Sequence, residues 1–252
     1  MTIYKNLETD RSKYLQTYLL ENYSKKSKAE IIEDLKLSWN YIQKMAHFFN
    51  IKREFNEGER KLIKLLDLND NITCYWIGFL LADGHLSRDC IFEINLSIKD
   101  ESHFEKIQEH LNIELSPRYV TKLNCVRYCL ADKQTISKIK KIFNWQTNKT
   151  KNIPTIPTLP KQQLFSLIIG FIDGDGSISK DGSDLHIRCD PSWKNILEKF
   201  YVVLCGEKKQ FKITNSGCSI IYISKWKVIQ KIKNKAEKLH LPIMQRKWDR
   251  VR

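Results

Sequence analysis

Two stretches of the sequence decide its fold: IIGFIDGDG at Ile168–Gly176 and WIGFLLADG at Trp76–Gly84. They agree in a Gly-Phe pair, in a small residue and in the final Asp-Gly, and Asp175 follows Asp83 by 92 residues (175 − 83). A stretch that recurs at a fixed distance is typical of a structural unit that occurs twice. We therefore expect the chain to contain two copies of one unit.

The segments that follow the two stretches repeat the same order of patterns. Apolar residues at every second position predict strands, and apolar residues three to four apart predict helices. The first copy continues with a strand at 90–99, a helix at 101–111, strands at 118–122 and 125–130, and a helix from Lys133; the second continues with a strand at 185–190, a helix at 192–205, strands at 210–214 and 219–224, and a helix after Lys225. Lys133 follows Asp83 by 50 residues (133 − 83), and Lys225 follows Asp175 by 50 (225 − 175). The patterns predict an α+β fold of two pseudo-symmetric αββαββα half-domains.

A proline-rich segment, Ile153–Pro160, separates the two copies. Its three prolines exclude a helix interior and favour a stiff, extended connector. We expect a helical extension with a linker at 1–70, the first half-domain at 71–152, the connector at 153–163 and the second half-domain at 164–252.

The two repeated stretches read as helices that are apolar almost all round, so both should be buried. Gly78 and Ala82 in the first, and Gly170 and Gly174 in the second, are four residues apart and lie on one helix face. Small residues at this spacing let two helix backbones approach closely. We expect the two helices to pack against each other at these residues. Gly84 and Gly176 are expected to end the helices in a left-handed cap.

Asp83 and Asp175 fall at the C-terminal ends of these helices. A carboxylate is unfavourable there, because the helix dipole is negative at that end. Two such groups side by side would also repel each other. Divalent cations between them would remove both penalties, and Mg²⁺ is commonly held by one or two carboxylates together with substrate phosphates. The two aspartates are therefore candidate metal ligands.

Composition points to a polyanion as the partner. The 252 residues include 43 Lys and Arg against 29 Asp and Glu, a net charge of +14. A folded domain this basic is a candidate nucleic-acid binder. The sequence has no apolar stretch long enough to span a membrane and no signal peptide, so we expect an intracellular, cytoplasmic protein of a bacterial or phage-infected cell, with an organelle as the alternative. Its seven cysteines show no zinc-site spacing and are interpreted as reduced thiols.

The two stretches resemble the paired motifs of single-chain LAGLIDADG homing endonucleases, and the resemblance covers about Asn71 to Arg252. The first stretch departs from the family name at Leu81, which stands where the name has its first Asp. The resemblance implies two four-stranded sheets that form a saddle over duplex DNA. It also implies Mg²⁺-dependent cleavage of both strands across the minor groove, with short 3′ overhangs, by a monomer; Mn²⁺ is expected to substitute.

The resemblance also implies roles for individual residues. Asp83 and Asp175 would be catalytic metal ligands, with the backbone carbonyls of Ala82 and Gly174 as further candidate ligands. Lys133 and Lys225 fall near the positions where the family places basic residues around the hydrolytic water. They are therefore expected to polarise that water or to offset charge at the phosphate.

The alternation of the strands predicts which side chains face DNA. If Phe92, Ile94, Leu96 and Ile98 pack on helices, the residues between them face the groove, and the same logic applies to the second half. Strand ribbons can enter a major groove, where Arg and Asn read base edges and Lys mainly contacts phosphate. The candidate DNA-binding residues are Glu93, Asn95, Ser97, Lys99, Arg118, Lys122, Arg127, His186, Arg188, Asp190, Lys212 and Tyr222. A register error of one residue near 119–130 would exchange the two faces.

The first 70 residues lie outside the repeat. Helices are predicted at 11–23, at 29–37 after the capping-box pattern Ser27–Glu30, and at 39–49 with Ser38 as its N-cap. The last two resemble a helix-turn-helix, and the candidate DNA contacts near the start of its recognition helix are Trp39, Asn40, Gln43 and Lys44. A supporting helical bundle is the alternative. The charged stretch 53–64 is interpreted as a linker helix.

Three functions are compatible with these patterns. The first is a site-specific homing endonuclease, and the second is a maturase that assists the folding of its own intron RNA. The third is a non-catalytic DNA-binding regulator. In the regulators that resemble this family the helix-turn-helix follows the LAGLIDADG-like domain and the carboxylates are typically lost, whereas both aspartates are present here. An intein is disfavoured, because the chain starts at Met1 and ends at Arg252 without the splicing residues.

Overall fold

The computed structural model describes residues 10–26, 28–51, 62–150, 152–209 and 219–251. The chain divides into two compact units, Met1–Arg60 and Lys61–Arg252, and each is described by itself. Within the described residues, no helix is both long enough and apolar enough to cross a bilayer.

The first unit is a bundle of three helices, α1 Asp10–Asn22, α2 Lys28–Leu35 and α3 Trp39–Phe48. Its core includes Leu19, Ile31 and Ile42, all fully buried. The Ser38 side chain accepts a hydrogen bond from the Tyr41 backbone N–H, so the predicted N-cap of α3 is confirmed. Ser27 of the predicted capping box and most of the predicted linker helix at 53–64 lie outside the described residues.

The first half-domain of the second unit alternates helices and strands in the predicted order. Its elements are α4 Asn71–Asp83, β1 Gly84–Leu86, β2 Ile91–Ser97, α5 Glu101–Leu111, β3 Arg118–Val120, β4 Cys125–Ala131 and α6 Lys133–Ile142. The strands form an antiparallel sheet in the order β1-β2-β4-β3. The β3 strand is short because a 3₁₀ turn, Thr121–Leu123, replaces its predicted second half.

The second half-domain repeats this order. Its elements are α7 Lys161–Asp175, β5 Gly176–Ile178, β6 Leu185–Cys189, α8 Lys194–Cys205, β7 Ser219–Ile223, α9 Trp226–Lys238 and α10 Gln245–Trp248. The described strands pair antiparallel in the order β5-β6-β7. The strand predicted at 210–214 lies outside the described residues. The predicted fold class, two half-domains of mixed helix and strand, is thus confirmed.

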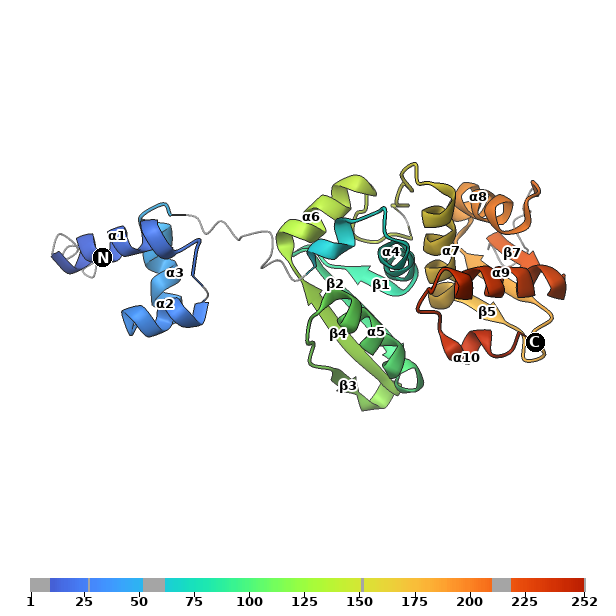
Figure 1. Ribbon diagram of the computed structural model, residues 1–252, viewed down its shortest axis with the longest axis horizontal. Helices are drawn as coiled ribbons and strands as arrows, with labels where there is room; N and C mark the ends of the chain where they lie inside the picture. The colour runs from blue at the N-terminus through green and yellow to red at the C-terminus, as the bar shows by residue number, and fades with distance from the viewer. Residues whose placement is uncertain (1–9, 27, 52–61, 151, 210–218, 252) are drawn as a thin grey trace. The chain divides into compact units, whose positions relative to one another are not determined.

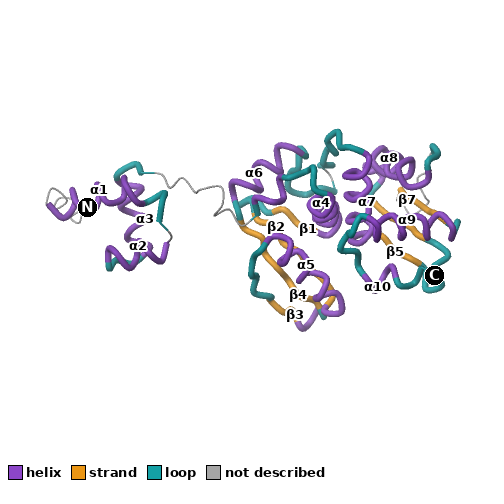
Figure 2. The backbone as a smooth tube through the Cα atoms, in the orientation of Figure 1, coloured by secondary structure: helices purple, strands orange, loops and turns teal. Residues whose placement is uncertain are grey.

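Helices α4 and α7 lie side by side between the two sheets (Figures 1 and 2). Both are apolar because both are buried along almost their whole length. A β-carbon built on Gly78 would overlap the Leu167 carbonyl oxygen, and one built on Gly170 would overlap the Tyr75 carbonyl oxygen. Tyr75 and Leu167 are themselves 92 residues apart (167 − 75), as are the two glycines, so the contact is symmetric. The predicted close approach of the two helices is confirmed.

The predicted left-handed caps at Gly84 and Gly176 are wrong. Both residues have extended backbone, with φ −73° at Gly84 and −82° at Gly176, and each starts the short strand after its helix. Glycine is needed there for space: a β-carbon would lie 2.5 Å from the carbonyl oxygen of Leu80 in the first case and of Ile172 in the second. The chain therefore passes directly from helix to strand beside its own last helical turn.

The connector Ile153–Pro160 has no regular secondary structure, as predicted from its prolines. It is nevertheless packed, because Ile153, Ile156 and Leu159 contact the main core and the Thr155 N–H donates to the Phe143 carbonyl at 2.7 Å. The connector therefore delivers the chain to the start of α7 along a fixed path.

We predict that Gly170→Ala destabilises the protein strongly. The added methyl group would meet the backbone of α4, which cannot move aside as a flexible side chain could, so the loss should be about 3 kcal/mol or more. Chemical denaturation of the second unit measures it. Gly206→Ala is the matched control: no atom lies within 4 Å of its built β-carbon, and only its positive φ of 75° should matter, at about 1 kcal/mol. Equal losses of stability in the two variants would contradict the close approach of the α4 and α7 backbones.

Candidate active site

The close approach of α4 and α7 brings Asp83 and Asp175 to one place. Near the C-terminal ends of the helices, a β-carbon built on Gly174 would overlap that of Ala82 and would lie 3.4 Å from the Asp83 carboxyl carbon. Asp83 is half-buried; the Asp175 residue has more exposed surface, but protein atoms still surround much of its carboxyl group. Each carboxylate stands where one helix ends and a strand begins, so the backbone on both sides of it is held in regular structure.

The surroundings make both carboxylates hold their protons more tightly than usual. Burial, followed by repulsion from Asp175, raises the pKa of Asp83 to about 6. Burial also raises the pKa of Asp175 above its ordinary value. Lys149 and Lys247 act in the opposite direction on both groups. The carboxylates are therefore poorly stabilised as anions by the protein alone, and a divalent cation beside them would favour their ionised form.

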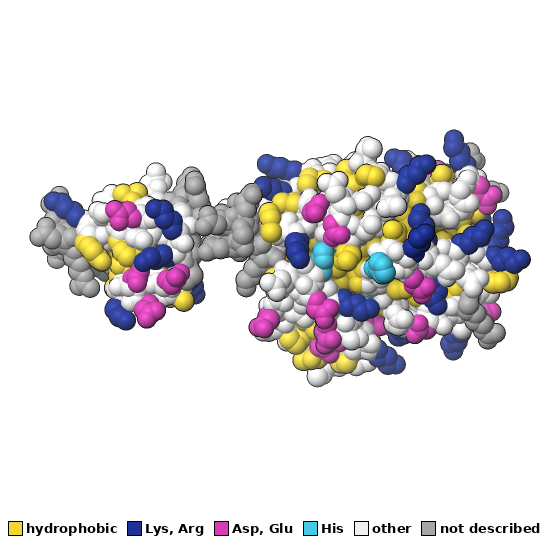
Figure 3. Space-filling view, in the orientation of Figure 1, with side chains coloured by type: hydrophobic (Ala, Val, Ile, Leu, Met, Phe, Trp, Pro, Cys, Tyr) yellow, Lys and Arg dark blue, Asp and Glu magenta, His cyan; other side chains and the backbone are white. Residues whose placement is uncertain are grey.

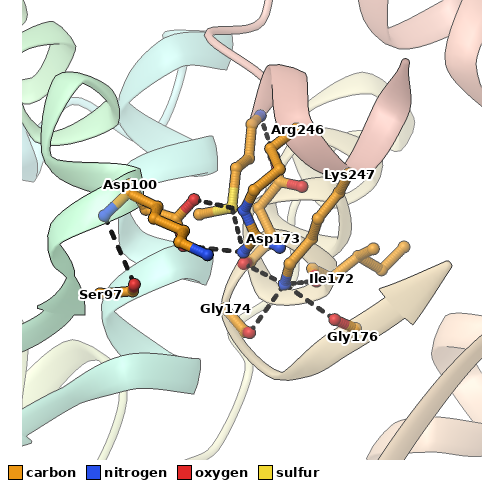
Figure 4. Close-up of polar contacts among 10 residues, drawn as sticks. Ser97, Asp100, Ile172, Asp173, Gly174, Gly176, Arg246 and Lys247 are labelled. Carbon is orange, nitrogen blue, oxygen red and sulfur yellow. Dashed lines mark hydrogen bonds and ion pairs between the residues drawn. The ribbon is translucent and has the colours of Figure 1, made fainter. Parts of the chain in front are cut away.

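Two lysines close the ends of the two helices. Lys149 Nζ donates to the backbone carbonyl of Ala82 and, at 2.9 Å, to that of Gly84. Lys247 Nζ does the same at the end of α7, donating to the carbonyls of Asp173 at 2.5 Å, Gly174 at 3.0 Å, Gly176 at 2.8 Å and Ile172 at 3.3 Å (Figure 4). The last carbonyls of a helix lack partners within the helix and carry its negative end charge, so a buried ammonium group is favourable there.

Burial lowers the pKa of both ammonium groups, although nearby carboxylates oppose the shift. An ammonium group has three N–H donors. The carbonyl contacts engage all three donors of Lys247, whereas Lys149 has two carbonyl partners among the described residues. Lys149 therefore keeps one N–H that can turn toward a bound molecule, while Lys247 provides a fixed positive charge.

The sequence prediction for the basic residues selected other lysines. Lys133 begins α6 and is exposed; Lys225 precedes α9, is exposed, and pairs with Glu207 at 3.6 Å. The positive charges that act on the two aspartates come from Lys149 and Lys247 instead. The criterion of equal spacing could not find this pair, because Lys149 follows Asp83 by 66 residues (149 − 83) and Lys247 follows Asp175 by 72 (247 − 175).

The donor set fits a hard divalent cation. The two carboxylates lie together and repel each other, and carboxylate oxygens suit such ions. The described residues contain no group of three or more His, Cys, Asp or Glu side chains at a common point, so other ligands would be water or substrate oxygens. The carbonyls of Ala82 and Gly174, predicted as further ligands, accept hydrogen bonds from Lys149 and Lys247.

A third aspartate lies behind this site. Asp173, on α7, is fully buried and accepts hydrogen bonds from Tyr75 Oη at 2.6 Å, from the Met244 backbone N–H at 2.9 Å and from Trp248 Nε1 at 2.6 Å. Burial raises its pKa, and these donors oppose the shift. Its counterpart in the first half is Leu81, which is buried among apolar side chains.

The arrangement of helices and sheets is similar to that of known structures. A lysine-to-alanine mutant of I-SmaMI superposes with a TM-score of 0.50 at 13% identity, over 70% of this chain and 87% of that one. The chain has the fold of the LAGLIDADG homing endonucleases. Weaker similarities include the LAGLIDADG homing endonucleases I-LtrWI bound to target DNA (TM-score 0.47, 12% identity, 69% and 85% of the two chains) and I-GzeII with its DNA target (0.45, 17%, 70% and 87%). No family model and no curated protein matches the sequence.

The LAGLIDADG fold of the first half presents one sheet face away from the helices, as the alternation predicted. Phe92, Ile94 and Leu96 of β2 are buried, and the side chains between them point the other way. Asn95 and Arg127 are opposite each other on β2 and β4, and Arg127 Nε donates to Asn95 Oδ1 at 2.8 Å. The prediction for Ile98 is wrong, because β2 ends at Ser97 and Ile98 is exposed in a 3₁₀ turn.

The other predicted DNA contacts lie at several places. Arg118 is opposite Arg127 on the edge strand β3, and His186 is opposite Tyr222 on β6 and β7. Lys99, Lys122 and Asp190 lie in or next to 3₁₀ turns instead of strands, and the Asp190 carboxylate caps one such turn. The strand residues on the outward faces are Glu93, Asn95, Ser97, Arg118, Arg127, His186, Arg188 and Tyr222, whereas Lys212 is outside the described residues. Figure 3 shows Lys and Arg side chains spread over the drawn face of this unit.

Three of the four contacts predicted for the first unit are surface residues. Asn40, Gln43 and Lys44 are exposed on α3. Trp39 instead packs against the core of the bundle, with its ring stacked on that of Tyr23 at 6.0 Å between centroids. Trp39, which is half-buried, therefore contributes to the core of the bundle.

We predict that Asp83→Asn stabilises the metal-free protein at neutral pH. The pKa of about 6 exceeds the ordinary 3.8, so the folded state holds this proton more tightly and stability is lost as the pH rises from about 4 to about 6. The neutral side chain avoids this loss, on the order of 2 kcal/mol. Chemical denaturation should show a higher free energy of unfolding for Asp83→Asn than for the wild type at pH 7.5, and no gain at pH 4.

Asp181→Asn serves as the control of opposite sign. Hydrogen bonds from Ser179 and Ser183 lower the pKa of Asp181 to about 2, so its removal should reduce stability at neutral pH. If Asp83→Asn changed the free energy of unfolding equally at both pH values, this would contradict the conclusion that the carboxylate pair is unfavourable when ionised.

Proposed function

We propose that this protein is a site-specific DNA endonuclease of the homing type, which hydrolyses one phosphodiester bond in each strand of a long target duplex. The observation that carries the proposal is the pair Asp83 and Asp175 at the joined ends of α4 and α7, where Lys149 and Lys247 donate to the terminal carbonyls. The similar structure of I-LtrWI is bound to its target DNA, and the net charge of +14 suits a polyanionic substrate.

Asp83 and Asp175 would hold Mg²⁺, with Mn²⁺ as a substitute. When bound, the cation lowers the pKa of a coordinated water and offsets charge on the leaving oxygen. Water attacks phosphorus, the bond from phosphorus to the 3′ oxygen breaks, and the products are a 5′-phosphate and a 3′-hydroxyl with a short 3′ overhang.

The chain's own residues hold the reacting groups in position and polarise them. The helix ends hold each carboxylate in place, and the ammonium groups of Lys149 and Lys247 offset the negative charge that builds up when phosphates approach two aspartates. Lys149 has an N–H free to donate to a phosphate oxygen or to the attacking water. We assign this work to Lys149 and Lys247 in preference to Lys133 and Lys225, because only the first pair acts on the carboxylates.

The two sheets would read the duplex through their outward faces. Asn95, Arg127 and Arg118 form a continuous polar group across β2, β4 and β3, with residue types that recognise base edges in a major groove. His186, Arg188 and Tyr222 occupy the matching face of the second half. One chain carries both halves, so a monomer would bind both half-sites, as expected of an enzyme that works inside the cell on an intron insertion site. An intron RNA is the alternative partner.

We predict that Asp175→Asn abolishes double-strand cleavage. The wild type is expected to linearise members of a plasmid library that contains randomised or insertion-site duplexes when Mg²⁺ is present. The variant should lose at least about 10²-fold in rate, because a neutral amide holds the cation much more weakly than a carboxylate does. Glu237→Gln, on the exposed surface of α9 in the same half, removes the same charge and should cut normally. A wild type that binds a duplex but never cuts it with Mg²⁺ or Mn²⁺ would contradict the proposal and favour a regulator or a maturase.

For the first unit we propose contact with flanking DNA through Asn40, Gln43 and Lys44. Lys44→Ala should weaken binding to the selected duplex several-fold and reduce its salt dependence. Lys13→Ala removes the same charge from the exposed surface of α1 and should have a smaller effect. Equal losses in both variants would show a general effect of charge and contradict a helix-turn-helix contact.

A further inference from the structure

Asp173 lies on α7 and connects this helix to the C-terminal segment of the chain. Its carboxylate has no exposed surface and accepts hydrogen bonds from three donors. One donor, Tyr75, comes from α4, and the other two, the Met244 N–H and Trp248 Nε1, come from the C-terminal segment. A buried carboxylate is costly unless it is hydrogen-bonded, so each of its bonds favours one position of the donor group.

Those two donors lie on either side of Lys247 in the sequence. Met244 lies three residues before this lysine and Trp248 directly after it, and both bonds end on the same carboxylate. Lys247 is itself buried, and its ammonium group reaches the carbonyls at the end of α7, two of which flank Asp175 (Figure 4). The bonds to Asp173 therefore define where the backbone of Lys247 stands relative to the second aspartate of the site.

The same segment is also attached to the first half-domain. Arg246 donates to both carboxylate oxygens of Asp100, at 2.6 and 2.7 Å, and Lys106 Nζ donates to the Ile243 carbonyl at 3.1 Å. These contacts hold the outer side of the segment, whereas the bonds to Asp173 hold the side that carries Lys247.

The two halves differ at this point. In the first half Leu81 occupies the position of Asp173 and cannot accept a hydrogen bond, and Lys149 reaches the end of α4 from the loop after α6. Only the end of α7 has a buried carboxylate that fixes the segment of its lysine.

On the basis of the proposed endonuclease function, we propose that Asp173 is a positioning residue for one of the two strand cleavages: through Met244 and Trp248 it places the ammonium group of Lys247 at the end of α7, beside the paired carboxylates. Lys149 reaches the end of α4 from another segment and does not depend on Asp173. Loss of Asp173 should therefore slow the cleavage of one strand and leave the other near its normal rate.

The first arm of the test measures hydrogen exchange in full-length protein. Asp173→Asn keeps the shape of the side chain but cannot accept from all three donors, because one of its two polar atoms is itself a donor. Exchange of the amides at 243–248 should accelerate about tenfold, and exchange near Lys149 should stay unchanged. Tyr75→Phe is the matched control, since it removes one bond to the same carboxylate from the opposite side and should leave 243–248 protected.

The second arm resolves cleavage by strand, on a duplex that the wild type linearises, with a different end label on each strand. Lys247→Met and Lys149→Met identify which strand depends on which lysine. Asp173→Asn should slow the strand that Lys247→Met slows, about tenfold to 100-fold, since small displacements of a positioned group have effects of this size. Nicked plasmid should accumulate, and Tyr75→Phe should still produce linear DNA.

Unchanged exchange at 243–248 in Asp173→Asn would overturn the proposal, and so would equal slowing of both strands or slowing of the strand that depends on Lys149. Failure of the wild type to cut any duplex would instead remove the endonuclease function, while the exchange arm would still decide whether Asp173 holds the segment that carries Lys247.

Discussion

The contact between the backbones of α4 and α7 is the constraint on which the rest of the second unit depends. Gly78 meets the carbonyl of Leu167 and Gly170 meets that of Tyr75, so the helices touch without side chains between them. This contact joins the half-domains into one core and sets their pseudo-symmetry. It also carries the two helix ends, and with them Asp83 and Asp175, to the same place. A larger residue at either glycine would separate both the halves and the carboxylates.

The site that results is electrostatically unfavourable until a cation or a substrate arrives. Two carboxylates lie at the negative ends of two helices. Burial, followed by repulsion from Asp175, raises the pKa of Asp83 to about 6. Lys149 and Lys247 limit the repulsion by neutralising the terminal carbonyls, yet burial also lowers their own pKa. Such strain is typical of catalytic sites, where stability is lower than it could be because the groups are arranged for chemistry.

The sequence predicted what repeats locally and missed what depends on distant segments. Alternation identified the buried side of β2 and β6, and the four-residue spacing of small side chains identified the helix contact, because both follow from the geometry of one element. The conformation predicted for Gly84 and Gly176 was wrong. A glycine that follows a helix can be needed either for space or for a positive φ, and the sequence does not distinguish these two reasons. Lys149 and Lys247 escaped detection because they reach the site from irregular segments at unequal distances along the chain. The hydrogen bonds of Asp173 could not be predicted either, because Met244 and Trp248 reach it from a distant segment of the chain.

The location of a bound divalent cation tests the central claim most directly. Crystals of the protein with a cleavable or uncleaved duplex, grown with Mn²⁺, would locate the ion by its anomalous scattering. The account predicts a peak in contact with the carboxylates of Asp83 and Asp175, close to the ends of α4 and α7, which disappears in Asp83→Asn. A peak elsewhere on the protein, with these two carboxylates unoccupied, would contradict it.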